Sequence, residues 1–329
     1  YLVAAELEKP LVTVPDSRAA LESETEDQRD ARHVKVAAAR SDTVVILHRG
    51  AWEYAPENTL SAIRAGFELG ATGVELDFRR TADGAIVLFH DERIERLLDG
   101  VGQVREYCYE ELLLHTFHSL PAPAAETDRV PTLPDVLQTI RDHAGLLHLD
   151  IKDSGIDGEL LEALRAADML DHVVTYNDYN SEAFHEAGVA KLPFKGSLMD
   201  EGRDTDPREA ELLLKRPGSL VILDDPRAAL TVLGRPPTRI SPKPWGPRGA
   251  LSPPALASLE AVLRGTSQQL PVRVAAVRLA IHAPRHFAEL AAELSRHPSG
   301  EIRRATAWNL GMLAKLRPEL VSSSVRAAL

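Results

Sequence analysis

Two carboxylates lie two residues apart in the segment Gly-Val-Glu-Leu-Asp at residues 73–77. Side chains at positions i and i+2 of a strand point to the same face, so Glu75 and Asp77 would present their oxygens together. Hard oxygen ligands of this kind suit Mg²⁺ or Ca²⁺. A third carboxylate, Asp150, ends a later apolar run. The sequence therefore predicts that Glu75, Asp77 and Asp150 bind one divalent cation, Mg²⁺ or Ca²⁺.

Histidines stand on both sides of the acidic pair, His48 in His-Arg-Gly and His90 in His-Asp. The free pKa of imidazole lies near neutrality, and proton transfer by such a group contributes about 10²–10⁴ in rate. His48 and His90 are thus the predicted catalytic acid and base, in an order left open. Arg49 and Lys152 would bind an anionic substrate, arginine through a bidentate fork and lysine as a point charge. Together these residues indicate hydrolysis at a phosphate group.

The composition excludes several other classes of protein. A net charge of -11 over 329 residues gives no basic face for nucleic acid and disfavours attraction to anionic membranes. No run of about 18 apolar residues is present, so no transmembrane segment is expected. Cys108 is the only cysteine, which rules out an internal disulfide. We expect a soluble protein, and the compartment stays open between the cytoplasm and export with removal of a leader.

From Asp42 onward, short apolar runs alternate with amphipathic stretches, as expected of βα units and a parallel sheet. The runs are 44–47, 73–77, 86–89, 146–150, 173–176, 194–198 and 220–223. Polar residues follow nearly every run, at the carboxyl ends of the strands, where active sites of TIM barrels are built. The predicted fold is an α/β TIM-type (β/α) barrel. Because the runs fall short of eight, the barrel is expected to be abbreviated or closed by an irregular segment.

Composition shifts divide the chain into four parts. Residues 1–41 are predicted to form an N-terminal arm or helix, and residues 42–234 the barrel. Residues 235–254 contain seven prolines and read as an extended linker. Residues 255–329 carry two similar seven-residue segments, starting at Val272 and Ile302 and offset by thirty residues. These resemble HEAT repeats and predict a small all-α segment. We expect this segment to have a structural role by packing against the barrel, and recruitment of a protein partner is the alternative.

The stretch from His48 to Asp91 resembles the glycerophosphodiester phosphodiesterase family. The matching blocks are His48-Arg49-Gly50, Pro56-Glu57-Asn58-Thr59, Gly70-Ala71, Glu75-Leu76-Asp77, Thr81-Ala82-Asp83-Gly84 and His90-Asp91. Weaker similarity extends the resemblance from about Asp42 to Leu230. It implies a PLC-like phosphodiesterase TIM barrel, metal ligands at Glu75, Asp77 and Asp150, and a role in lipid metabolism. The implied substrate is a small-molecule or lipid-derived phosphodiester.

The chain also departs from the family pattern. Asp150 stands where the family more often has glutamate, and an aromatic segment expected between Lys195 and Ser219 is missing. Two alternatives to hydrolysis therefore stay open. One is a lyase or phospholipase D-type reaction that cleaves lysophospholipid or sphingomyelin and releases cyclic phosphate. The other is a non-catalytic binding or scaffold protein.

Several neighbouring residues allow two readings each. Glu57 is a supporting residue, either a partner of the dipole of the following helix or a neighbour of the metal site. Asn58 or Thr59 is expected to cap that helix. Asp91 either orients His90 or ends its strand. Trp52 and Tyr54, in the loop after the first strand, could contact a choline-like group or pack as a lid.

Overall fold

The computed structural model describes residues 21–52, 54–94, 96–117, 128–176, 182–199, 206–235, 277 and 284–316, without the side chains of 284–286, 308 and 311–316. The strands are β1 (Val44–His48), β2 (Gly73–Arg80), β3 (Ile86–Leu88), β4 (Leu146–Ile151), β5 (Val174–Thr175), β6 (Ala190–Lys191), β7 (Phe194–Leu198) and β8 (Leu220–Leu223). The helices are α1 (Glu26–Ser41), α2 (Leu60–Glu68), α3 (Tyr109–Leu112), α4 (Leu133–Asp142), α5 (Asp157–Ala166), α6 (Glu182–Glu186), α7 (Pro207–Leu214), α8 (Arg227–Val232), α11 (Pro284–Leu294) and α12 (Gly300–Leu316). Two 3₁₀ turns, η1 (Val104–Glu106) and η2 (Leu170–His172), complete the described elements.

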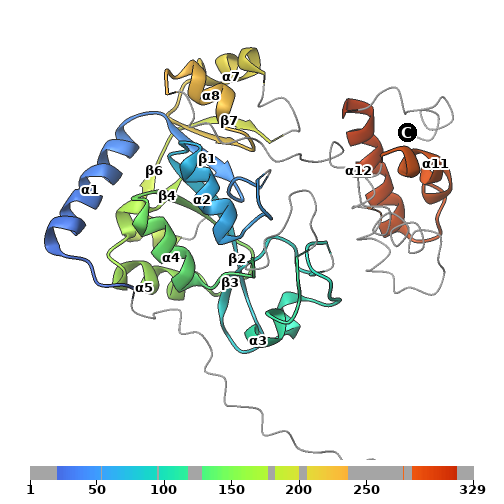
Figure 1. The fold of residues 1–329 in the computed structure, drawn as a ribbon, viewed down its shortest axis with the longest axis horizontal. Helices are drawn as coiled ribbons and strands as arrows, with labels where there is room; N and C mark the ends of the chain where they lie inside the picture. Colours follow the sequence, from blue (N-terminus) through green and yellow to red (C-terminus); the bar gives the residue numbers. More distant parts are fainter. Residues whose placement is uncertain are drawn as a thin grey trace, which may run out of the picture.

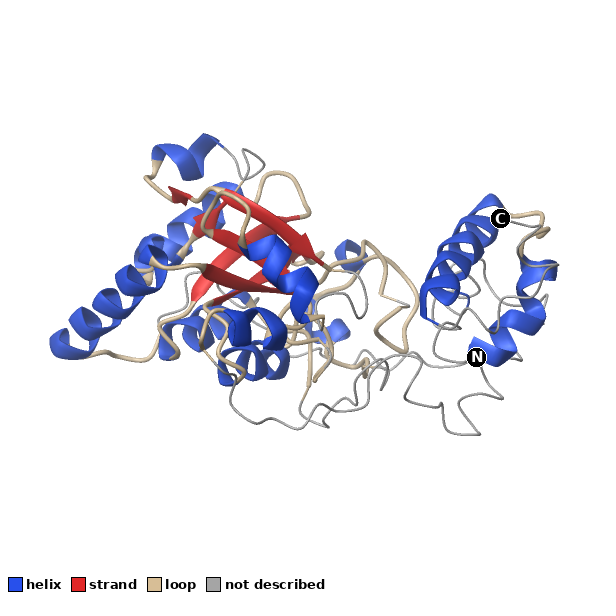
Figure 2. Ribbon diagram, turned by 90° about the horizontal axis from the view of Figure 1, so that it is seen from above, coloured by secondary structure: helices blue, strands red, loops and turns tan. Residues whose placement is uncertain are grey.

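The parallel strands follow one another around a ring. β1 pairs with both β2 and β8, so the last strand of this part lies against the first. β2 pairs with β4, a bridge between Leu147 and Val173 joins β4 to the start of β5, and β5 pairs with β6. Residues 190–198 carry both β6 and β7, and β7 pairs with β8. The described strands thus form an abbreviated barrel with crossover helices on its outside (Figures 1 and 2), and the irregular closure falls at residues 190–198.

β3 differs from the expectation of a parallel sheet, because it pairs with β2 in the antiparallel direction, with Phe78 opposite Leu88. The prediction for this run is wrong for a simple reason. Only residues 81–85 separate the two strands, which is enough for a hairpin turn but too short for a crossover. The returning chain passes Asp77, whose carbonyl accepts the N–H of Phe89 at 3.0 Å. The hairpin therefore brings His90 back to the level of Asp77.

Alternation along the strands separates two buried clusters. On β1, Val45 and Leu47 belong to the cluster that packs against the helices. Val44 and Ile46 belong to a second cluster with alternate residues of the other strands. This arrangement follows from the two-residue period of a strand. The side chains of the second cluster fill the inside of the ring below the carboxyl ends of the strands.

α1 covers the amino ends of these strands. Val36 is fully buried in the same cluster as the first residues of β1, β4, β5 and β8. The helix begins after Thr25, which forms a capping box with Gln28. The buried guanidinium of Arg32 donates to Glu24, to the carbonyl of Asp168 and to His172 Nε2. Within residues 1–41, α1 thus packs onto the barrel through Val36.

The C-terminal helices α11 and α12 lie side by side in both views (Figures 1 and 2). Their buried side chains include Phe287, Leu290, Leu294, Ile302 and Leu310. The first of the two repeated segments, like the linker at 236–254, lies outside the described residues apart from Val277. The HEAT-like assignment therefore stays a prediction.

Within the described part of the chain, no helix combines the length and apolar content that crossing a membrane requires.

Candidate active site

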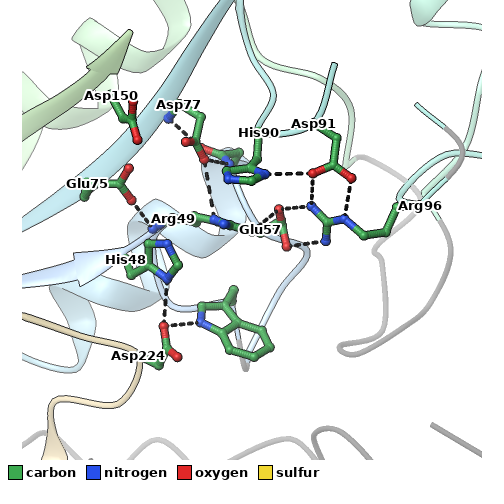
Figure 3. A network of polar contacts seen from close by, with 12 residues as sticks. His48, Arg49, Glu57, Glu75, Asp77, His90, Asp91, Arg96, Asp150 and Asp224 are labelled. Carbon is green, nitrogen blue, oxygen red and sulfur yellow. Dashed lines mark hydrogen bonds and ion pairs between the residues drawn. The ribbon is translucent and has the colours of Figure 1, made fainter. Parts of the chain in front are cut away.

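Strand register places the predicted site residues at one level of the ring. His48, at the end of β1, lies opposite Glu75 of β2, and Asp77 lies opposite Asp150 of β4. All four face inward, because on their strands they alternate with residues of the cluster that packs against the helices, which includes Leu47, Val74, Leu76 and Leu149. The carboxyl ends of parallel strands open at the same end of a barrel, so these side chains share its mouth. Figure 3 shows them together with Arg49, His90 and Asp224.

Glu75, Asp77 and Asp150 form the centre of the site. One carboxylate oxygen from each lies within 4.8 Å of the others. Burial and the neighbouring Asp77 carboxylate raise the pKa of Glu75, which shows how closely negative charge is packed here. The Oδ1 atoms of Asp77 and Asp150 are buried and accept no hydrogen bond. Three hard oxygen donors with unused lone pairs fit a divalent cation.

Lys152 lies at the edge of this acidic group. Its Nζ donates to Asp150 Oδ2 at 2.7 Å and forms an ion pair with Asp77 Oδ1 at 3.0 Å. Burial alone would lower the pKa of Lys152, but the carboxylates of Asp77 and Asp150 outweigh it and raise the pKa. Lys152 therefore stays charged at the mouth of the barrel, next to the predicted metal ligands.

The loop after β1 fixes two of the carboxylates. Asn58 donates its amide to Asp77 Oδ2 at 2.7 Å and accepts the N–H of Asp77 at 3.1 Å. Arg49 donates its backbone N–H to Glu75 Oε2 at 2.9 Å. Both Arg49 and Asn58 have left-handed backbone, with φ of 58° and 57°. Such residues are uncommon outside glycine, and here the unusual turn aims an N–H and an amide at the acidic group. Thr59, not Asn58, caps α2.

His48 is held by a carboxylate from the far end of the barrel segment. Its Nδ1 lies 2.9 Å from Asp224 Oδ1, and the same oxygen accepts the indole N–H of Trp52 at 2.8 Å. Burial would lower the pKa of His48, but the hydrogen bond with Asp224 and the charge of Glu75 outweigh it and raise the pKa. Because a carboxylate only accepts, Nδ1 carries the proton and Nε2 is the nitrogen left for chemistry.

His90 has a similar partner. Its Nδ1 lies 2.7 Å from Asp91 Oδ1, so Asp91 orients His90. Arg96 in turn donates to both oxygens of Asp91, at 2.7 and 3.2 Å. Burial would raise the pKa of Asp91, but Arg96 and the hydrogen bond from His90 outweigh it and hold the pKa far below its usual range. The site thus contains two histidine–aspartate pairs, His48 with Asp224 and His90 with Asp91 (Figure 3).

Glu57 lies in a different environment from the three clustered acids. Arg49 donates to its Oε1 at 3.0 Å, and Arg96 donates to Oε1 and Oε2 at 2.5 and 2.7 Å. Burial would raise the pKa of Glu57, but Arg96 and Arg49 outweigh it and lower the pKa to about 2. Glu57 is therefore a partner of two arginines, in support of Arg49, and not a member of the acidic group.

The eight residues singled out from the sequence gather at one mouth of the barrel. Three further residues of the site are not predicted by the sequence patterns. Asp224 is one of the polar residues that follow the apolar runs, Asn58 is expected only as a helix cap, and Arg96 belongs to no motif. Trp52 contacts Asp224 through its indole N–H. A signal existed for Asp224, because it directly follows β8. Arg96 lies in a loop, where no periodicity indicates its direction.

The fold and site define an α/β barrel protein with a cluster of three carboxylates flanked by two histidine–aspartate pairs. The sequence model of the Glycerophosphoryl diester phosphodiesterase family matches residues 48–190. The family resemblance is therefore confirmed for this part of the chain. All eight predicted site residues lie within the matched range, and His48 is the first residue matched.

Individual relatives agree with this assignment. Glycerophosphodiester phosphodiesterase of Caldanaerobacter subterraneus is 34% identical over 145 residues, which are 42% of this chain and 60% of that protein. Glycerophosphodiester phosphodiesterase 1 of Bos taurus is 31% identical over 197 residues, 57% of this chain and 54% of that protein. The chain thus spans little more than half the length of these relatives.

Two solved structures are also similar. The crystal structure of a glycerophosphodiester phosphodiesterase from Agrobacterium tumefaciens has 18% identity and a TM-score of 0.46, covering 56% of this chain and 98% of that one. A phosphodiesterase from Oleispira antarctica, in complex with the product sn-glycerol-3-phosphate, has 21% identity and a TM-score of 0.39, covering 60% and 92%.

Proposed function

We propose that this protein is a metal-dependent phosphodiesterase that hydrolyses glycerophosphodiesters to an alcohol and glycerol 3-phosphate. The observation that carries the proposal is the position of the acidic group Glu75, Asp77 and Asp150 beside two histidines that are each held by an aspartate. The family match over residues 48–190 supports the choice of a phosphodiester as substrate. Hydrolysis of such esters places the protein in lipid metabolism.

Glu75, Asp77 and Asp150 would hold one divalent cation, Mg²⁺ or Ca²⁺. When bound, the cation neutralises charge on the phosphoryl oxygens and polarises the phosphorus centre. Arg49 and Lys152 add positive charge at the same mouth, in a protein whose net charge is -11. Arg49 is preorganised for this task, because Glu57 holds its Nη1 at 3.0 Å.

His48 and His90 act as the acid–base pair. A water oxygen forms the new bond to phosphorus while the bond from phosphorus to the alcohol oxygen breaks. One histidine takes a proton from the water through Nε2, and the other gives a proton to the departing alcohol oxygen. In both rings the Nδ1 atom is occupied by a carboxylate, Asp224 for His48 and Asp91 for His90, so each ring has a fixed orientation.

The test is release of glycerol 3-phosphate from glycerophosphocholine and glycerophosphoethanolamine by the purified protein. Reactions are run with Mg²⁺, with Ca²⁺ and with chelator, and products are followed by phosphorus NMR. We expect metal-dependent release of glycerol 3-phosphate.

The alternatives give different products. A cyclic phosphate that accumulates from lysophospholipid would favour the lyase reaction, for which the aspartate at position 150 is the supporting sequence feature. Absence of turnover on every diester, with metal bound, would favour a binding protein.

A further inference from the structure

Arg96 connects two parts of the site that belong to different sequence motifs, one with Glu57 and one with Asp91. The residue lies in the loop after β3, and its guanidinium faces Glu57 on one side and Asp91 on the other (Figure 3). Nη1 and Nη2 donate to the two oxygens of Glu57 at 2.7 and 2.5 Å. Nε and Nη2 donate to the two oxygens of Asp91 at 2.7 and 3.2 Å. Arginine thus makes a bidentate contact with each carboxylate.

Each of these two carboxylates also forms a hydrogen bond with a residue of the proposed mechanism. Asp91 holds the Nδ1 of His90 at 2.7 Å, and Glu57 holds the Nη1 of Arg49 at 3.0 Å. The contacts therefore run from His90 through Asp91, Arg96 and Glu57 to Arg49. The side chains of Glu57, Asp91 and Arg96 are only 6%, 15% and 20% exposed, so solvent screens these ion pairs little.

We propose that Arg96 is a positioning residue that sets, through Asp91, the orientation and tautomer of His90, and, through Glu57, the place of the phosphate-binding Arg49. This inference rests on the proposed function for the roles of His90 and Arg49. Arg96 itself touches neither of them. It acts by keeping both carboxylates charged and fixed, so that Asp91 accepts from Nδ1 and Nε2 of His90 is presented to the substrate.

Lysine would not replace arginine in this role. A guanidinium is planar and offers its N–H groups in a fixed fork, which matches two carboxylates at once. An ammonium is a point charge that can satisfy either Glu57 or Asp91 with good geometry. Arg96→Lys therefore keeps the charge and removes the geometry, which makes it a conservative test of positioning.

The kinetic experiment compares kcat and KM of Arg96→Lys, Asp91→Asn and the double variant on glycerophosphocholine with Mg²⁺. Groups that act through one another give non-additive effects. We expect Arg96→Lys to lower kcat roughly 10- to 100-fold. Losses of about this size are typical when a residue that orients a reacting group is replaced. In the Asp91→Asn background, the same change should lower kcat less than about threefold.

The effects of the two contacts of Arg96, with Glu57 and with Asp91, can be measured separately. Glu57→Gln leaves Asp91 and Arg96 in contact and loosens Arg49, so it should raise KM more than it lowers kcat.

Arg32→Lys is the matched control for Arg96→Lys. Arg32 likewise makes a bidentate contact with a carboxylate, through three hydrogen bonds to Glu24, but it is buried under the barrel on α1. Arg32→Lys should lower the melting temperature and leave kcat unchanged.

A second readout does not depend on turnover. The ring nitrogens of His90 are observed by ¹⁵N NMR and assigned by the loss of their signals in His90→Gln. The wild-type ring should carry its proton on Nδ1, whereas Arg96→Lys should populate both tautomers. If the wild type hydrolyses no diester, the proposed function fails while this measurement still tests the role of Arg96. An unchanged His90 tautomer in Arg96→Lys, or equal losses of kcat in both backgrounds, would overturn the proposal.

Discussion

Asp224 accepts a hydrogen bond from His48 Nδ1 at 2.9 Å, although the two residues are 176 positions apart in the sequence. The contact exists because β8 pairs with β1 in parallel, with Leu223 opposite Leu47, so the residues that follow these positions emerge side by side. The first and last strands of the barrel segment thus complete one histidine–aspartate pair of the candidate site.

Asp224→Asn should lower kcat roughly 10- to 100-fold, because an asparagine amide can donate to Nδ1 and favour the wrong tautomer of His48. The measurement is steady-state kinetics on glycerophosphocholine. Asp225→Asn is the control, since Asp225 is also buried but bonds Arg227. It should change stability and leave kcat near the wild-type value. Equal kcat values for Asp224→Asn and wild type would remove Asp224 from the site.

His48→Gln and His90→Gln should each fold, bind the divalent cation and lose about 10²–10⁴ in kcat, because neither histidine is among the three clustered carboxylates. Circular dichroism checks the fold, and calorimetric titration with Mg²⁺ and Ca²⁺ checks the cation. Turnover retained by both variants would contradict the acid–base assignment.

Asp77→Ala should abolish metal-dependent turnover and weaken binding of the cation, because it removes one of the three clustered carboxylates that we propose hold the cation. Calorimetry with Mg²⁺ and Ca²⁺ measures the binding directly, apart from activity. Asp153→Ala is a suitable control, since Asp153 bonds Arg79 at 2.7 Å and is not one of the three clustered carboxylates. Tight binding of the cation by Asp77→Ala would show that the cation is held elsewhere.

Glu57 should contribute to stability in a pH-dependent way. Its pKa is lowered from 4.5 to about 2, mainly because Arg96 and Arg49 outweigh the effect of burial. A carboxylate with a depressed pKa stabilises the fold fully above its unfolded pKa, and this stability is lost as pH falls from about 4.5 to about 2. The shift corresponds to roughly 3 kcal/mol at neutral pH.

The check is urea denaturation of wild type and Glu57→Gln at pH 7, 4.5 and 3. The difference in unfolding free energy between the two proteins should be largest at pH 7 and should shrink toward pH 3. A difference that is constant over this range would mean that the charge of Glu57 contributes nothing.

Val36→Asp should destabilise the protein by about 3–5 kcal/mol, because it places an unpaired charge where α1 covers the amino ends of the strands. Val34→Asp is the matched control on the same helix, since Val34 is 69% exposed. Its effect should stay within about 0.5 kcal/mol. Thermal denaturation distinguishes the two, and equal melting temperatures would show that α1 is not part of the cooperative fold.

The sequence by itself determined the residue types of the site and most of the strands that carry them. The i and i+2 spacing of Glu75 and Asp77 fixes their common face in any strand. The apolar runs and the polar residues after them follow from local periodicity, and β1, β7 and β8 begin where these runs predicted. The sequence also predicts a helix capped by Asn58 or Thr59, and α2 spans Leu60–Glu68 with Thr59 as its cap.

Only the tertiary structure decided which of these groups touch. The direction of β3, the closure of the ring at residues 190–198, and the partners Asp224 and Arg96 depend on strand order and on the path of loops. Local patterns carry no information about such contacts, because periodicity specifies the face of an element and not its neighbour in space. The residue types of the candidate site were therefore predictable from the sequence, whereas the orientation of its two histidines depended on the fold.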